Sequence, residues 1–304
     1  SGRVVVGDSA SHESHLIHID KPLLRVAQLA IHLDRDVNDG LKLDRQAHLV
    51  PIWGLGETEE GAFRSFLATE LGVNDTEVLS WDMMCHDLTP SSPLGRNEEF
   101  YAAPRIDNLA SCHAALEALR DIESVASNTI SAVVLFDHEE IGSESSTGAR
   151  GPMLSHALER IAGTRAVSRE QFLRSLSRSA CISADGAHAV HPNYVDRHEP
   201  GHQVVLNGGP VIKLNANVRY ATDAESSAVA QSACRSAGVP FQQYAHRSNL
   251  PCGSTIGPIT ASQLGMLVVD IGSPQLSMHS AREMAGASDP AYLTAALKAF
   301  LSDG

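Results

Sequence analysis

The sequence predicts an α/β protein, in which a largely parallel, mixed sheet is flanked by helices. Two observations lead to this class. From about residue 100 onward, short β-branched segments alternate with segments of helical periodicity, the order that builds such a sheet. The chain of 304 residues is 43% hydrophobic and 19% charged, which is enough apolar material for a substantial buried core.

The first part of the chain is expected to form a separate unit of short strands. Strands are predicted over residues 3–6, 15–19 and 47–52, between polar turns. A helix is predicted over 56–72, with Gly72 as its C-terminal stop. Residues 89–95 are rich in turn formers, so the boundary between a domain at 1–95 and a domain at 96–304 is placed there.

The second part alternates strand and helix. Helices are predicted over 108–120, 152–161, 222–237 and 289–301, and strands over 130–136, 180–184, 211–215, 241–245 and 267–271. Thr222 and Asp223 form a capping-type start for the third of these helices, and Asp289-Pro290 starts the last.

Composition excludes several classes of function. Asp and Glu number 36 against 23 Lys and Arg, and the net charge of −13 argues against a nucleic-acid binder and against docking on anionic lipid. No apolar run reaches the length of a membrane span. The five cysteines are widely spaced and form no CxxC, so we expect neither a disulfide framework nor a thiolate zinc site, and a reducing, cytoplasmic compartment.

Potential metal ligands follow several of the predicted strands. The strand at 130–136 leads into Glu139 and Glu140, the strand at 180–184 into Asp185, and the strand at 267–271 toward His279, while Asp107 precedes a helix. Because the carboxyl ends of such strands meet at one edge of a sheet, these side chains are expected to converge. Carboxylates and imidazoles suit Zn²⁺ or Mn²⁺.

The adjacent pair Glu139-Glu140 is the most informative feature. Neighbouring residues in a loop point in different directions, so one carboxylate can bind a metal while the other acts as a general base. Taken singly, each candidate also has an ordinary structural interpretation. Asp107 could cap a helix, Asp185 could form a turn, and His279 could be a structural histidine. Lys213 lies inside an apolar strand and needs an anionic partner, either an internal carboxylate or an acidic ligand.

Seven segments together resemble the aspartyl aminopeptidase family, the M18 metallopeptidases, along essentially the whole chain. The motifs that carry the resemblance are APRIDN, FDHEEIGSES, SADGAHAVHPNY, GPVIKLN, RYATD, PCGSTIGPI and SPQLSMHSARE. The resemblance implies an exopeptidase with two divalent metal ions, most often zinc with manganese or cobalt as alternatives, that releases N-terminal Asp or Glu from peptides. It also implies a homo-oligomer, a dodecamer built from dimers, with residues 1–95 as an inserted, mostly-β dimerisation domain.

The same resemblance suggests roles for individual residues. Asp107 matches a carboxylate that bridges both metals, Glu139 the general base, Glu140 and His279 ligands of one metal, and Asp185 a ligand of the other. His188 and Lys213 match substrate contacts, and Lys213 would pair with the acidic side chain of the substrate. His32 matches a histidine that enters a neighbouring subunit's active site, although its apolar surroundings in the sequence alone indicate a core residue.

The sequence departs from the family at one ligand. The family carries a further metal-binding histidine in an N-terminal His-Thr-Asp-Ser-Pro motif, which does not occur here, and Ser1 leads directly into a predicted strand. We therefore expect an N-terminal part of a longer chain to be absent. Two other interpretations stay open: an aminopeptidase of different specificity, and a non-catalytic homologue that acts as an assembly subunit. Phosphoryl transfer at paired metals has no supporting motif.

Overall fold

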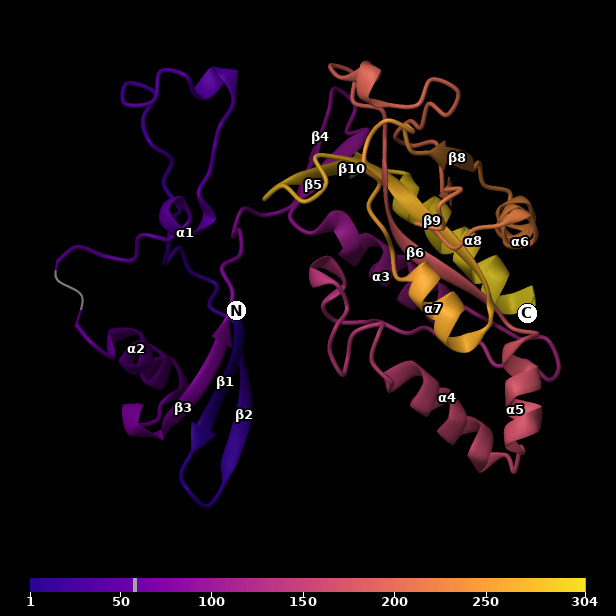
Figure 1. Ribbon diagram of the computed structural model, residues 1–304, viewed down its shortest axis with the longest axis horizontal. Coiled ribbons are helices and arrows are strands. Elements are labelled where there is room, and N and C mark those ends of the chain that lie inside the picture. Colours follow the sequence, from indigo (N-terminus) through magenta and orange to yellow (C-terminus); the bar gives the residue numbers. More distant parts are fainter. Residues whose placement is uncertain (57–58, 304) are drawn as a thin grey trace. The chain divides into compact units, whose positions relative to one another are not determined.

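The computed structural model describes residues 1–56 and 59–303, and the chain divides into two compact units, Ser1–Leu88 and Thr89–Gly304 (Figure 1). In the first unit, strand β1 (Gly2–Gly7) pairs antiparallel with both β2 (His12–Ile17) and β3 (Val78–Met83). Helix α2 (Ala62–Leu71) covers this sheet, and Val4, Leu67 and Val78 are fully buried between them.

The expected end of the first helix at Gly72 is confirmed. Gly72 has a φ of 70°, and its N–H donates to the carbonyls of Ala68 and Thr69, which closes the last turn. The helix begins at Ala62, later than predicted, and residues 57–58 of the prediction lie outside the described residues.

The strand predicted at 47–52 is wrong. A one-turn helix, α1 (Arg45–His48), forms there because the carboxylate of Asp44 accepts hydrogen bonds from the N–H groups of Gln46 and Ala47. Of the predicted strand residues, Ile52 alone makes a β-bridge, with Arg25. Outside residues 57–58, this unit also contains two single-turn 3₁₀ helices, η1 (Val37–Asp39) and η2 (Asp75–Glu77).

The second unit is built on a seven-stranded mixed sheet with the order β4-β5-β10-β9-β7-β8, in which β6 also pairs with β9. The strands are β4 (Ser92–Leu94), β5 (Phe100–Ala103), β6 (Ala180–His188), β7 (Val211–Leu214), β8 (Gln242–Ala245), β9 (Leu267–Leu276) and β10 (Glu283–Gly286). The pairs β6–β9 and β7–β8 are parallel, and the other pairs are antiparallel.

Helices flank this sheet, as the sequence predicts (Figure 1). They are α3 (Ile106–Arg120), α4 (Met153–Thr164), α5 (Arg169–Leu176), α6 (Ala224–Ser236), α7 (Gly257–Leu264) and α8 (Asp289–Asp303), with the 3₁₀ turns η3 (Glu139–Ile141) and η4 (Val195–Arg197). Helices α3, α6 and α8 pack against β7 and β9 in the main core, around Ala114, Ile212, Val269 and Leu293. None of the described helices is long and apolar enough to cross a bilayer.

In the second unit, three predicted strands differ from the structure by more than one residue. Residues 130–136 are not a strand, and they form no backbone ladder with any described strand. Strands β6 and β9 continue four and five residues beyond the predicted ends, because nine consecutive residue pairs hold them together in register. Asp185 and His188 therefore lie inside a strand and not in the loop that follows it.

Candidate active site

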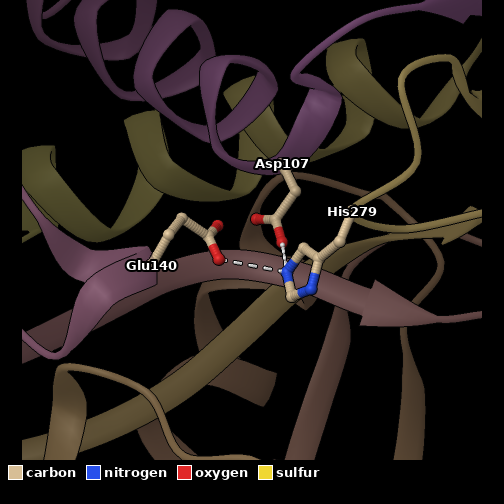
Figure 2. A group of neighbouring side chains, drawn as sticks. All are labelled: Asp107, Glu140 and His279. Carbon is tan, nitrogen blue, oxygen red and sulfur yellow. Dashed lines mark ion pairs between the residues drawn. The ribbon is translucent and has the colours of Figure 1, made fainter. Parts of the chain in front are cut away.

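Three of the predicted metal ligands meet at one point. One ligand atom from each of Asp107, Glu140 and His279 lies within 4.8 Å of the other two. The Nε2 atom of His279 is 3.2 Å from Oδ2 of Asp107 and 3.1 Å from Oε2 of Glu140. Figure 2 shows both carboxylates directed at the imidazole ring. The three side chains come from the start of α3, from η3 and from the loop between β9 and β10.

The backbone around Asp107 explains its position. Asp107 and Asn108 have non-helical dihedral angles at the start of α3, so the carboxylate does not cap the helix. Its side chain is 4% exposed, and its Oδ1 atom has no hydrogen-bond partner. A Cβ atom placed on Gly186 would lie 3.2 Å from this Oδ1, so only glycine leaves the carboxylate its present room.

The Glu139-Glu140 pair sits in a tight turn. The N–H of Gly142 donates to the carbonyl of Glu139, and the N–H of Ser143 donates to that of His138. Within this turn the two carboxylates separate: Glu140 contacts His279, whereas Glu139 lines a cavity of about 330 Å³. The cavity is also lined by Ser143, Arg150, Ser254, Thr255 and Ile259, among others. Burial, followed by the charges of Asp185 and Glu140, raises the pKa of Glu139 to about 7.

Asp185 lies beside Asp107 and is paired with Lys213. The Nζ atom of Lys213 is 2.9 Å from Oδ2 of Asp185 and 2.7 Å from the carbonyl oxygen of Gly186. The amide of Asn108 donates to the other oxygen of Asp185. Burial by itself would raise the pKa of Asp185, but Lys213 outweighs it and lowers that pKa to about 2.

The two neighbouring carboxylates indicate a place for a cation. Burial, and then the negative charge of Asp185, raises the pKa of Asp107 to about 8. A carboxylate that is buried, lacks a partner for one oxygen and lies against another carboxylate is costly unless a cation or a proton is present. Carboxylate oxygens and an imidazole nitrogen are the donors that zinc binds in proteins. The residues present therefore fit a zinc site.

The two remaining predicted site residues, His188 and His32, do not belong to this cluster. His188 ends β6 with its ring 6.1 Å from that of Tyr244. Desolvation by neighbouring protein atoms, followed by the positive charge of Lys213, lowers the pKa of His188 to about 4. Part of the His188 side chain nevertheless stays exposed. His32 belongs to the first unit, on an exposed turn, so its interpretation as a core residue is wrong.

Two residues that position the site have no role in the sequence-based prediction. Asn108 holds Asp185, as described above, and Glu283 accepts the backbone N–H groups of both Asp107 and His279. Asn108 stands in the motif APRIDN, directly after Asp107, and Glu283 stands in the motif SPQLSMHSARE, four residues after His279. Their places in these motifs are the sequence signal that could have identified them. A residue whose function is to bind the backbone shows no characteristic spacing from the metal ligands.

Carboxylates and an imidazole gather at the edge of the sheet of this α/β unit, and a further carboxylate lines the cavity beside them. These are the features of a metal-dependent hydrolase. Comparison with known proteins specifies the class. The chain belongs to the Peptidase_M18 family, described as aminopeptidase I zinc metalloprotease (M18), whose profile matches residues 1–301.

Individual relatives agree with this membership. The chain is 48% identical over 305 residues to the "Probable M18 family aminopeptidase 2" of Streptomyces coelicolor, covering 99% of this chain and 70% of the relative. The Ape4 and Nbr1 complex gives a TM-score of 0.90 at 36% identity, over 99% of this chain and 62% of that one. The S. cerevisiae mApe1 dodecamer gives 0.79 at 25% identity, over 98% and 67%. The chain thus spans about two thirds of the length of the solved chains.

Proposed function

We propose that this M18 family member is an aminopeptidase with two zinc ions that releases N-terminal Asp or Glu from peptides. The observation that carries the proposal is the convergence of Asp107, Glu140 and His279, with Asp185 beside Asp107. Asp107 directs Oδ2 at His279, while Oδ1 lies on the side of Gly186 without a partner. A carboxylate that offers one oxygen on each side suits a bridge between two cations.

The ligands divide between two ions. Asp107, Glu140 and His279 would hold one, and Asp107 with Asp185 would contribute to the other. Zinc supplies Lewis acidity when bound, which lowers the pKa of water and polarises a peptide carbonyl. Manganese and cobalt accept the same oxygen and nitrogen donors, so the native metal is part of the proposal.

Glu139 is the proposed general base. Its carboxylate belongs to the turn that carries Glu140, but it lines a separate cavity and so stays free to exchange a proton. With a pKa near 7 it can accept a proton from the attacking water and return it to the leaving amine. The cavity beside it offers room for the part of the peptide that follows the cleaved bond.

Lys213 is the proposed determinant of acidic specificity. An ammonium group has three donors, and two of them are used by Asp185 and Gly186. The third could receive the carboxylate of a substrate Asp or Glu, with His188 as a second contact. Because Lys213 is only 3% exposed, the charge pair would form away from water, where it discriminates strongly.

We further propose that the protein works as a homo-oligomer in the cytoplasm, a dodecamer as in the S. cerevisiae relative. Several large apolar side chains of the first unit are exposed on residues 24–55, and Leu33 is 75% and Val50 65% exposed. Surfaces of this kind are typical of protein interfaces. His32 lies in the same segment, which supports its proposed role toward a neighbouring subunit. The five cysteines, all free, suit a reducing compartment.

The proposal is tested by metal content and substrate preference measured on one sample. We expect two zinc ions per chain and faster cleavage of Asp- and Glu-amides than of Leu-amide. Two metals with a preference for Leu-amide would favour an aminopeptidase of different specificity. Absence of both metal and turnover would refute the proposal in favour of an assembly subunit.

A further inference from the structure

Glu283 is a buried carboxylate whose two oxygens each accept a backbone hydrogen bond from a proposed metal ligand. Glu283 is only 2% exposed. Oε2 accepts the N–H of Asp107 at 2.8 Å, and Oε1 accepts the N–H of His279 at 2.6 Å. Both oxygens are thus engaged by residues 176 and 4 positions away in the sequence.

The sheet explains why one residue reaches both. Strand β10, which starts at Glu283, lies between β5 and β9. Strand β5 ends at Ala103, directly opposite Glu283, and its chain continues into Asp107. Strand β9 ends at Leu276, and its chain continues into His279. Glu283 therefore stands where the two ligand-bearing segments leave the sheet.

We propose that Glu283 is a positioning residue that fixes the separation of Asp107 and His279, so that their side chains are placed for zinc before the ion binds. This inference rests on the proposed zinc site. The backbone of His279 has a φ of 65°, in the left-handed region that is costly for a residue with a side chain. Such a conformation persists only when surrounding contacts hold it, and the Glu283 bond to the His279 N–H is one of these contacts.

The role requires a carboxylate. Two N–H donors face the group, and only a carboxylate presents two acceptor oxygens to them. Glutamine offers one acceptor and one amide donor, so in Glu283→Gln one backbone N–H would face another donor. The segment that loses its bond, either that of Asp107 or that of His279, would then be free to move relative to the other.

Asp289, at the start of helix α8, provides a matched control. It is 1% exposed, and its two oxygens accept the backbone N–H groups of Asn207 and Gly209 at 2.7 and 3.0 Å. Neither of those residues belongs to the proposed site. Asp289→Asn therefore repeats the same chemical change, in an equally buried place, without touching the metal ligands.

The experiment measures Zn²⁺ affinity of the metal-stripped protein by competition with a chromophoric chelator, with circular dichroism and melting temperature recorded for each variant. Loss of positioning of ligands typically weakens metal binding about 10–100-fold, so we expect that loss in Glu283→Gln and a change within about threefold in Asp289→Asn. Glu283→Asp, which keeps the charge but is too short to reach both N–H groups, is expected to lose at least about tenfold.

Affinity of Glu283→Gln within about threefold of the parent, or an equal loss in Asp289→Asn, would overturn the positioning role. If Glu283→Gln does not show the parent's circular dichroism, Glu283→Asp decides by the same thresholds. A parent protein with no saturable Zn²⁺ binding would instead refute the proposed function, and the inference with it. Failure of the two claims therefore gives different results.

Discussion

Replacing Lys213 by methionine tests the electrostatics at the centre of the site. Lys213 and Asp185 lie 2.9 Å apart, with side chains 4% and 18% exposed. At an effective dielectric constant of about 20, unit charges at this separation attract by about 6 kcal/mol, part of which offsets their removal from water. Methionine keeps the length and apolar stem of lysine but leaves the Asp185 carboxylate buried without its cation. We expect the free energy of unfolding of the metal-free protein to fall by about 3–5 kcal/mol.

The assay is a double-mutant cycle followed by urea unfolding. Lys213→Met, Asp185→Asn and the double variant are compared with the parent, all without metal. Because each single change leaves one buried partner unpaired, the double variant should be far more stable than the sum of the single losses implies. A coupling free energy below about 1 kcal/mol would refute the view that these two charges balance each other.

The same variant separates two roles of Lys213 in activity. If Lys213 receives the acidic side chain of the substrate, Lys213→Met should lose about 2–5 kcal/mol of transition-state binding with Asp-amide. This corresponds to a fall in kcat/KM of about 30-fold to a few thousand-fold, with a much smaller fall for Leu-amide. Equal losses on both substrates would mean that Lys213 acts only through Asp185.

Three further predictions concern the proposed base Glu139, the space that Gly186 leaves for the Asp107 carboxylate, and the pH dependence of stability. Glu139→Gln should retain bound zinc but lose at least about 100-fold in kcat, and near-parent turnover would remove Glu139 from its role. Gly186→Ala should weaken Zn²⁺ binding measured by chelator competition, because its Cβ would lie 3.2 Å from the Asp107 carboxylate; unchanged affinity would contradict the tight packing. Burial raises the pKa of Asp289 to about 6, so the folded state holds this proton more tightly than the unfolded state. The protonated Asp289 carboxyl group therefore contributes about 3 kcal/mol to the free energy of unfolding below about pH 4. This contribution is lost as the pH rises through about 6. Urea unfolding across this range should show a decline that is about 3 kcal/mol larger in the parent than in Asp289→Asn, because the raised pKa values of Asp107 and Glu139 affect both proteins alike; parallel curves would contradict it.

The sequence predicts most of the local structure where one segment carries its own signal. The helix end at Gly72 and the cap at Asp223 are examples, since in each case a single residue satisfies exposed backbone groups of its own helix. The prediction fails where the outcome depends on a partner. Residues 130–136 have strand composition, yet a strand requires a ladder of backbone hydrogen bonds with a partner, and these residues pair with no described strand. The register of β6 with β9 likewise decides that Asp185 lies inside a strand.

The candidate site shows the same division. The carboxylates and His279 are predictable as ligands because their residue types and their places after strands are visible in the sequence. Glu283 is not predictable, because its function consists of two hydrogen bonds to the backbone of other segments. The pairing of Lys213 with Asp185 was one of two open alternatives, and only the adjacency of β6 and β7 residues in space selects it.

The charges of the site explain why these positions belong together. Asp107, Glu139, Glu140, Asp185 and Glu283 place five carboxylates around one edge of the sheet, and Lys213 is the buried cation among them. Lys213 pairs with Asp185 and lowers the pKa of that carboxylate to about 2. Backbone N–H groups satisfy both oxygens of Glu283. For Asp107 and Glu139, burial and the neighbouring carboxylates outweigh the attraction of Lys213, and their pKa values are raised to about 8 and about 7. The fold thus compensates Asp185 and Glu283 from within the protein, and it raises the pKa of Asp107, a proposed metal ligand, and of Glu139, the proposed base, as expected where a cation or a proton is to be received.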